Sequence, residues 1–192
     1  MNVRLVLLGP PGSGKGTQGT SLSAHLDVPV VSTGALFRDQ ISRGTPLGRE
    51  AESYTSQGQL VPDSVTNAMV EQRLGEADAA GGFILDGYPR NAAQVLVLEG
   101  ILARLGVKLD AVVELALPES MIVERLLNRA QIEGRADDTE PVILQRIAVY
   151  REQTEPLSKL YRERGNLIEV DGVGSIDAVR ERVMAALAAK GF

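Results

Sequence analysis

Short apolar runs alternate along the chain with longer segments in which apolar residues recur at every third or fourth position. Most of the runs lack regular alternation with polar residues, which is typical of parallel strands that helices cover on both faces. Such runs alternating with helical segments indicate consecutive βαβ units. The pattern predicts an α/β fold of three layers (α/β/α) around a five-stranded parallel sheet. The predicted strands are residues 3–8, 29–31, 82–85, 111–117 and 167–170.

Proline and serine mark several expected helix starts. Pro62 with Asp63 resembles the beginning of one helix, and Pro118 and Pro141 are expected in first turns, where a missing N–H leaves no hydrogen bond unmade. Ser175 is of the residue type that caps a helix through its side-chain oxygen. The helix after it is expected to bury apolar residues spaced three and four apart. These are Ile176, Val179, Val183 and Leu187.

Two segments do not fit the alternating pattern. Residues 32–61 are polar, contain glycine and hold several helical fragments, and residues 128–138 form a charged stretch between two helical patterns. We expect both to be insertions into a single domain that spans residues 1–192. Ligands of parallel α/β folds bind beyond the carboxyl ends of the strands. Both insertions are therefore expected to lie over that edge of the sheet.

Composition narrows the class of protein. The 192 residues are 44% hydrophobic and 23% charged, the balance of an ordinary globular protein. The chain has no Cys, which excludes a disulfide framework and a Cys-based zinc site. Its net charge of −5 provides no global basic field for nucleic acid. The apolar run at the N-terminus is too short for a signal peptide or a membrane span. We expect a cytoplasmic protein with neither nucleic acid nor membrane as a partner.

A glycine-rich loop directly follows the first predicted strand and opens a predicted helix. It has the G-x-x-x-x-G-K pattern in the strand-to-helix context that the pattern requires, which makes the fold P-loop NTPase-like. Backbone N–H groups of small residues can turn inward around phosphate oxygens, and Lys15 adds a mobile positive charge for the β- and γ-phosphates. Gly16 stands where Ser or Thr usually follows the lysine. We therefore expect Mg²⁺ to be held by phosphates and water, with no direct protein ligand. The loop is Gly9-Pro10-Pro11-Gly12-Ser13-Gly14-Lys15-Gly16-Thr17.

The predicted strand at residues 82–85 is followed directly by Asp86. An apolar strand that ends in a carboxylate is Walker-B-like, and Asp86 would orient the waters of Mg²⁺ beside the loop. Taken alone the pattern is weak, because Asp is a common turn residue after strands. Its combination with the phosphate loop favours a nucleotide site.

The loop and the turn that follows Asp86 resemble the nucleoside monophosphate kinases, and among them the short-lid adenylate kinases. The resemblance extends over essentially the whole chain. Residues 32–61 are similar to the family's NMP-binding insertion, and residues 128–138 to its short lid, which lacks a zinc-binding hairpin. The resemblance implies a monomeric phosphotransferase that interconverts ATP, AMP and ADP with Mg²⁺ and without zinc. The turn is Asp86-Gly87-Tyr88-Pro89-Arg90.

The resemblance also implies an acceptor site built from several segments. Thr33 would contact the adenine of AMP and Arg38 its phosphate, while the backbone of residues 59–61 would line the adenine pocket. Gln94, four residues after Arg90, matches the glutamine that reads the adenine edge. The implied AMP-binding residues are Thr33, Arg38, Gln59, Leu60, Val61, Gly87, Tyr88, Pro89, Arg90, Gln94, Arg135 and Arg146.

Arginines around the second insertion match lid positions of the same family. A lone Arg could be a solvated surface residue, but several at loops or element edges of an acidic protein favour phosphate binding, which suits the planar guanidinium. Arg125 also falls at a spacing that matches the lid positions of this family, although a place on the surface of its helix could equally explain an arginine there. The implied ATP-binding residues are Gly12, Ser13, Gly14, Lys15, Gly16, Thr17, Arg129 and Gly174, the last through its backbone. The catalytic candidates are Lys15, Asp86, Arg90, Arg129, Arg135 and Arg146.

The residues favour direct in-line transfer. The phosphate of AMP, with a second pKa of about 6, is largely deprotonated at neutral pH and needs no general base. The only histidine, His25, is expected to be a surface or packing residue. No Cys and no recognisable Ser-His-Asp set offers a covalent intermediate.

Two alternatives remain open from the sequence. A UMP/CMP kinase would share the loop and the arginines, and Asn91 after Arg90 supports it, whereas Thr33 and Gln94 match adenine-reading positions. A P-loop ATPase or switch would hydrolyse nucleotide without an acceptor. The N-K-x-D element of guanine-specific switches does not occur in the chain.

Overall fold

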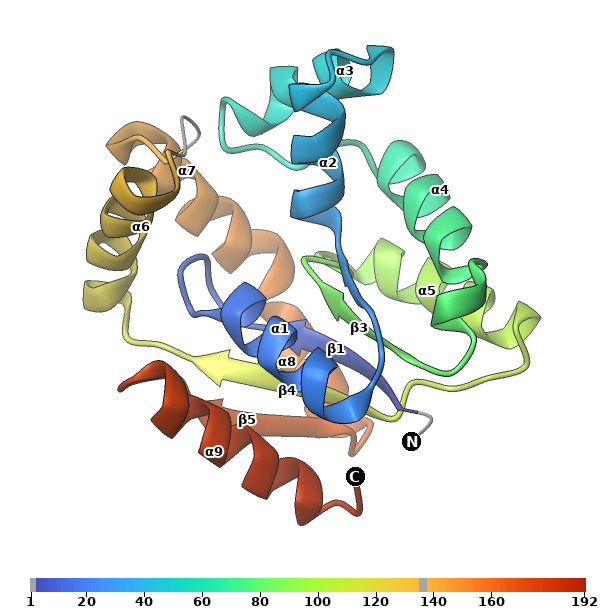
Figure 1. The fold of residues 1–192 in the computed structure, drawn as a ribbon. Coiled ribbons are helices and arrows are strands. Elements are labelled where there is room, and N and C mark those ends of the chain that lie inside the picture. Colours follow the sequence, from blue (N-terminus) through green and yellow to red (C-terminus); the bar gives the residue numbers. More distant parts are fainter. Residues whose placement is uncertain (1–2, 135–137) are drawn as a thin grey trace.

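The computed structural model describes residues 3–134 and 138–192, and it confirms the predicted fold class (Figure 1). Five parallel strands form one sheet in the order β2-β3-β1-β4-β5. All five predicted strands are present, and their ends lie within one residue of the predictions. The strands are β1 (Arg4–Leu8), β2 (Val30–Ser32), β3 (Phe83–Asp86), β4 (Ala111–Ala116) and β5 (Leu167–Asp171).

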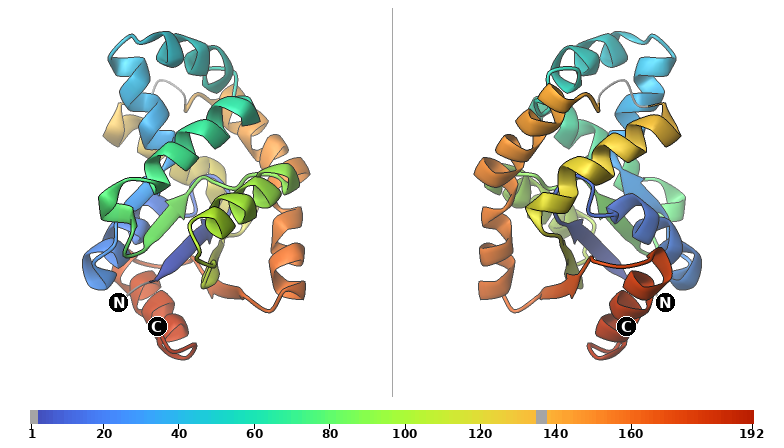
Figure 2. Two further views of the ribbon diagram at one scale, coloured as in Figure 1. Left: turned by 90° about the vertical axis from the view of Figure 1, so that its right-hand side faces the viewer. Right: turned by 90° about the vertical axis from the view of Figure 1, so that its left-hand side faces the viewer.

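Helices cover both faces of the sheet. One face packs against α1 (Lys15–Leu26) and α9 (Ile176–Ala188), and the other against α4 (Asp63–Leu74), α5 (Ala92–Arg104) and α8 (Pro156–Glu163). Figure 2 shows α5 and α9 on different sides of the strands. Successive strand residues point to opposite faces, so the neighbours Leu5 and Val6 are both fully buried in different cores. Apart from Arg4, Asp86 and Glu114, the residues of the three central strands are apolar, because helices cover both faces of the sheet.

Most expected helix starts are close to the observed ones. Pro141 lies in the first turn of α7 (Glu140–Val149), and Ser175 caps α9 by accepting a hydrogen bond from the Ala178 N–H (3.2 Å). Pro62 and Pro118 are N-cap residues of α4 and α6 (Glu119–Glu133), one position before the first turn. The prediction for Pro118 was therefore wrong by one residue.

Ile176 corrects the prediction for the last helix. Val179, Val183 and Leu187 are buried against the sheet, but the side chain of Ile176 is 61% exposed. It is the first residue of α9, and it lies at the rim where the helix leaves the core. The predicted spacing holds for Val179, Val183 and Leu187, and only Ile176, at the start of the helix, does not pack against the sheet.

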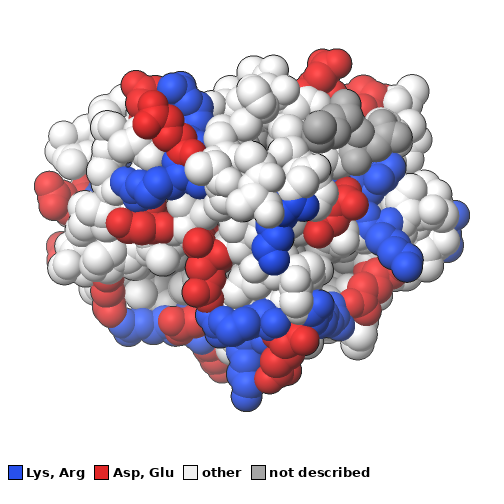
Figure 3. All heavy atoms as spheres, turned by 90° about the horizontal axis from the view of Figure 1, so that it is seen from below, with Lys and Arg blue, Asp and Glu red and all other residues white. Residues whose placement is uncertain are grey.

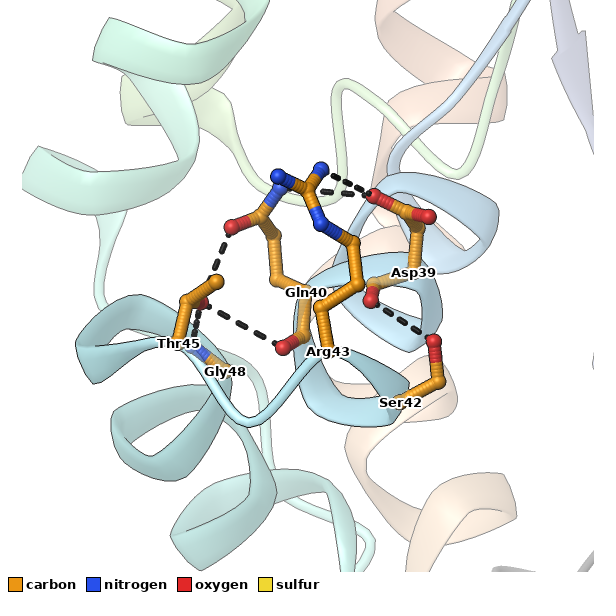
Figure 4. Close-up of polar contacts among 6 residues, drawn as sticks. All are labelled: Asp39, Gln40, Ser42, Arg43, Thr45 and Gly48. Carbon is orange, nitrogen blue, oxygen red and sulfur yellow. Dashed lines mark hydrogen bonds and ion pairs between the residues drawn. The ribbon is translucent and has the colours of Figure 1, made fainter.

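A helical hairpin projects from the sheet between β2 and α4 (Figure 1). It consists of α2 (Thr33–Ser42) and α3 (Pro46–Thr55), joined by the turn drawn in Figure 4. The hydroxyl of Thr45 accepts a hydrogen bond from the Gly48 N–H (2.9 Å) and donates one to Oε1 of Gln40 (2.9 Å). A Cβ on Gly48 would lie 2.1 Å from the backbone oxygen of Gln40. Glycine is thus required for the close approach of the two helices.

The hairpin has a small apolar core of its own, formed by Phe37, Ala51 and Val61. A second projecting pair, α6 and α7, packs through Ile122, Leu126, Ile143 and Ile147. A π-helical turn (Tyr150–Thr154) connects α7 to α8, and a 3₁₀ turn (Ala77–Ala79) precedes β3. Each projecting pair therefore has its own packing, apart from the two cores of the sheet.

The face seen in Figure 3 carries Lys and Arg side by side with Asp and Glu. Arg180 pairs with Asp177 (2.8 Å), Arg182 with Asp171 (3.4 Å), and Arg162 with Glu169.

Within residues 3–134 and 138–192, none of the helices has the length and apolar character needed to span a membrane.

Candidate active site at the carboxyl edge of the sheet

The glycine-rich loop leaves β1 and enters α1, whose N-cap is Gly14. The Lys15 side chain folds back over the loop, and its Nζ donates hydrogen bonds to the carbonyl oxygens of Gly9 (2.8 Å) and Pro10 (2.9 Å). Burial lowers the pKa of Lys15 to about 8, the Asp86 carboxylate opposes this shift, and neighbouring arginines add to it. The loop therefore holds a cation beside a helix N-terminus, where anions bind.

Asp86 ends β3 next to this loop. Its Oδ2 accepts a hydrogen bond from the hydroxyl of Ser32 (3.1 Å), which sequence reasoning did not single out. A Cβ on Gly16 would lie 3.9 Å from the same oxygen. The carboxylate thus faces the position where a Ser or Thr usually follows the lysine.

Two cavities lie over this edge of the sheet. The larger, of about 720 Å³, runs along the phosphate loop and reaches Arg125, Arg129, Gly174 and Ile176. The smaller, of about 260 Å³, is lined mainly by α2, α3 and the segment before α4. The two cavities share Gly34, Arg38, Gly58, Leu60, Gly87, Arg90 and Arg146 as wall residues. They are therefore adjacent, and three arginines stand at their boundary.

Arg90 is held at that boundary by backbone and side-chain contacts. Its Nε donates a hydrogen bond to the Gly87 carbonyl (2.8 Å), which also accepts one from the Thr33 hydroxyl (2.9 Å). The Thr154 hydroxyl, from the π-helical turn, donates one to the Arg90 carbonyl (2.7 Å). Burial lowers the pKa of Arg90, and the Asp86 charge opposes this. Gly87 has φ 79° and no room for a Cβ, which would lie 2.8 Å from the Thr33 hydroxyl.

Arg129 and Arg146 converge on one buried carboxylate. Both Nε (2.7 Å) and Nη2 (2.9 Å) of Arg129 donate hydrogen bonds to Asp138, and Nη1 of Arg146 donates another (2.6 Å). The Asp138 side chain is 0% exposed. Sequence reasoning placed the two arginines here and missed the aspartate that joins them. A buried carboxylate is rare without such partners, but the sequence does not reveal its burial.

Gln94 lies in the wall of the smaller cavity with Thr33, Gln59, Leu60 and Val61. Its backbone N–H donates a hydrogen bond to the side chain of Asn91 (2.8 Å), the N-cap of α5. The presence of Asn91 is thereby accounted for by helix capping, and it carries no independent support for a pyrimidine acceptor.

The remaining predicted site residues do not all line the cavity in which the sequence placed them. Pro89 lines the larger cavity, whereas Tyr88 is fully buried in a core and borders neither cavity. Arg125 lines the larger cavity and donates a hydrogen bond to the Gly172 carbonyl (3.2 Å). The prediction for Arg135 lies outside the described residues. His25 is exposed on α1 and borders neither cavity.

Comparison with known proteins agrees with this arrangement. The family model described as adenylate kinase matches residues 7–166. The chain belongs to the adenylate kinase family. Its adenylate kinase relatives include one from Thermobifida fusca (strain YX), 53% identical over 96% of this chain and 98% of the relative. Another, from Nocardia farcinica (strain IFM 10152), is 56% identical over 96% of this chain and 99% of the relative. A third, from Xylella fastidiosa (strain 9a5c), is 50% identical over 96% of this chain and 99% of the relative.

The match to the adenylate kinase family covers most of the site. It begins within β1 and ends after α8, so it includes the phosphate loop, the hairpin α2–α3 and the arginines at the cavity boundary. Gly174 lies beyond it, but the near full-length relatives extend the likeness over almost the whole chain.

Proposed function

We propose that this adenylate kinase family member transfers a phosphoryl group reversibly between ATP and AMP and forms two molecules of ADP. ATP would occupy the larger cavity, with its phosphates on the loop around Lys15 and its base near Gly174. AMP would occupy the smaller cavity, with its base near Thr33 and Gln94.

The observation that carries this proposal is the shared wall of the two cavities. Arg38, Arg90 and Arg146 border both, so phosphates that enter from the two sides would meet among three guanidinium groups. Arginine binds phosphate oxygens in pairs. A hydrolase or switch needs only the larger cavity, whereas a second cavity beside the same arginines fits an acceptor nucleotide.

The transfer would proceed by in-line attack. An oxygen of the AMP phosphate forms a bond to the γ-phosphorus of ATP, and the bond between that phosphorus and the β–γ bridging oxygen breaks. The departing β-phosphate carries the electron pair, and both products are ADP. Charge in this loose transition state spreads over phosphoryl oxygens, and Lys15, Arg90, Arg129 and Arg146 would stabilise it. No protein group needs to take a proton.

Mg²⁺ would enter as the complex with ATP. Among the described residues, no group of three His, Cys, Asp or Glu side chains gathers as a metal site. The lone carboxylate of Asp86 fits an ion that phosphates and water mainly hold. The ion would neutralise phosphate charge, and Asp86 would orient its waters.

The two insertions would have separate tasks. We propose residues 32–61 as the AMP-binding insertion and residues 128–138 as a short lid that brings Arg129 toward ATP and excludes water. By resemblance, Arg135 would also contact the exchanged phosphates. We propose a monomer in the cytoplasm, with no zinc and no nucleic-acid or membrane partner, and the absence of Cys suits a reducing compartment.

A coupled assay with Mg-ATP tests the proposal, with AMP, CMP, UMP or no acceptor offered in parallel. Rapid ADP formation with AMP alone is the expected result. Preference for CMP or UMP would contradict the assignment of the smaller cavity. ADP release without an acceptor would contradict phosphoryl transfer itself.

A further inference from the structure

An acidic side chain outside the predicted site holds the amide of Gln94. Asp63 is the first residue of α4, and its Oδ1 accepts a hydrogen bond from Nε2 of Gln94 (2.7 Å). Asn91 donates hydrogen bonds to both carboxylate oxygens of Asp63 (3.1 Å each). The carboxylate lies in the first turn of a helix, where a negative charge is stabilised. Asp63 is therefore fixed in place from two sides.

The oxygen of the same amide is held from the other direction. The backbone N–H of Arg90 donates a hydrogen bond to Oε1 of Gln94 (2.7 Å). Reversal of the amide would bring its NH₂ group to the Arg90 N–H and its oxygen to the carboxylate of Asp63. A carboxylate has no proton to donate to that oxygen. Because Gln94 is 1% exposed, water cannot compensate for such mismatches.

The fixed amide has one donor and one acceptor left. A glutamine amide carries two N–H groups and two lone pairs, and the contacts with Asp63 and Arg90 use one of each. The remaining pair complements a base edge with an amino donor and a ring-nitrogen acceptor, as in a 6-aminopurine. A 6-oxopurine presents the reverse order, with a carbonyl acceptor and a ring N–H donor. It would require the reversed amide.

We propose that Asp63 is a positioning residue that sets the acceptor specificity, by fixing the orientation in which Gln94 faces the base. The inference rests on the proposed function and assigns to the Asp63 carboxylate, together with the Arg90 N–H, the rejection of 6-oxopurine nucleotides. Rejection follows from unpaired buried polar groups, which a site built for one hydrogen-bonding pattern imposes on the wrong base. Asp63 acts through Gln94 and does not touch the reacting atoms.

Asp63→Asn tests this role, with AMP and IMP as acceptors. IMP differs from AMP at the edge in question, where a carbonyl replaces the amino group and the ring nitrogen carries a proton. The asparagine offers Gln94 a donor as well as an acceptor, so it removes the mismatch of the reversed amide at position 63, and only the mismatch with the Arg90 N–H remains. We expect the ratio of kcat/KM for AMP to that for IMP to fall at least about tenfold, as loss of one charge-assisted hydrogen bond implies. An equal fall with both acceptors, which leaves the ratio unchanged, would overturn the proposal.

Two controls separate positioning from stability. Asp177→Asn makes the same change in the first turn of α9, outside both cavities, and should leave the ratio unchanged. In a Gln94→Leu background, Asp63→Asn should no longer alter the ratio, and a further change there would contradict action through Gln94. Asp63→Ala serves as a second variant if the asparagine variant does not fold. If the unmodified protein did not use AMP at all, the proposed function would fail, whereas an unmoved ratio in an AMP-active protein rejects only the role of Asp63.

Discussion

Asp138 offers the sharpest test of how the arginines of the site are organised. Its carboxylate is 0% exposed and accepts three hydrogen bonds, two from Arg129 and one from Arg146. In Asp138→Asn one oxygen becomes an NH₂ group of nearly the same size. At least one guanidinium then faces a donor in place of an acceptor. The change removes charge and acceptor capacity without creating a cavity.

The size of the effect follows from these contacts. Hydrogen bonds to charged groups contribute about 1.5–3 kcal/mol each. The side chains of Arg129 and Arg146 are 26% and 21% exposed, so water would replace part of what is lost. A net cost of about 2–3 kcal/mol in arginine placement corresponds to a kcat that is lower by about 30- to 140-fold, at about 1.4 kcal/mol per tenfold change in rate.

Steady-state kinetics with both nucleotides varied, together with thermal unfolding, would measure this effect. The matched control is Asp39→Asn, which alters an exposed pair with Arg43 (3.1 Å) and should change kcat less than about twofold. If Asp138 instead competes with phosphates for the arginines, its variant would keep kcat and bind ATP more tightly. That result would refute the reasoning.

Three further predictions concern other parts of the site. Arg90→Ala should lower kcat about 10³-fold or more with an unchanged melting temperature. Its control is Arg43→Ala, at an exposed position of the hairpin, which should change kcat by less than about twofold. A loss of kcat below about tenfold in Arg90→Ala would show that this side chain does not stabilise the transition state. Gly48→Ala forces a Cβ to within 2.1 Å of the α2 backbone, so it should destabilise the protein by about 1–3 kcal/mol. It should also raise the KM for AMP more than the KM for ATP, and equal increases in the two KM values would contradict this. Because the pKa of Lys15 is lowered to about 8 and its protonated form binds phosphate, kcat/KM for ATP should be constant below that pH and fall above it. The kcat of the saturated enzyme should hold to higher pH, and the same profile in His25→Ala would exclude the histidine as its source.

The strands and the phosphate loop could be predicted from the sequence because the patterns that indicate them are local. Uninterrupted apolar runs located each strand to within one residue, and the loop motif stands next to its strand and helix. Two predictions at helix ends were wrong. Pro118 is an N-cap where a first-turn position was expected, and Ile176 is exposed although the periodicity of α9 places it on the buried face.

The contacts that organise the site could not be predicted from sequence. Asp63 meets Gln94 across 31 residues, and Thr154 meets Arg90 across 64. Such pairs depend on how the helices pack over the sheet, and no spacing rule connects them. Family resemblance supplied the residues proposed to face nucleotides, but it did not supply Asp138, Thr154 or Asp63, which contact Arg129, Arg146, Arg90 and Gln94.

The central claim, transfer between two nucleotides, is tested most directly with ADP as the only nucleotide supplied, in the presence of Mg²⁺. Transfer from one ADP to another forms ATP and AMP in equal amounts, and we expect phosphorus NMR to show both at the same rate without inorganic phosphate. Release of phosphate with AMP but no ATP would identify a hydrolase. That outcome would contradict the proposed pairing of the two cavities.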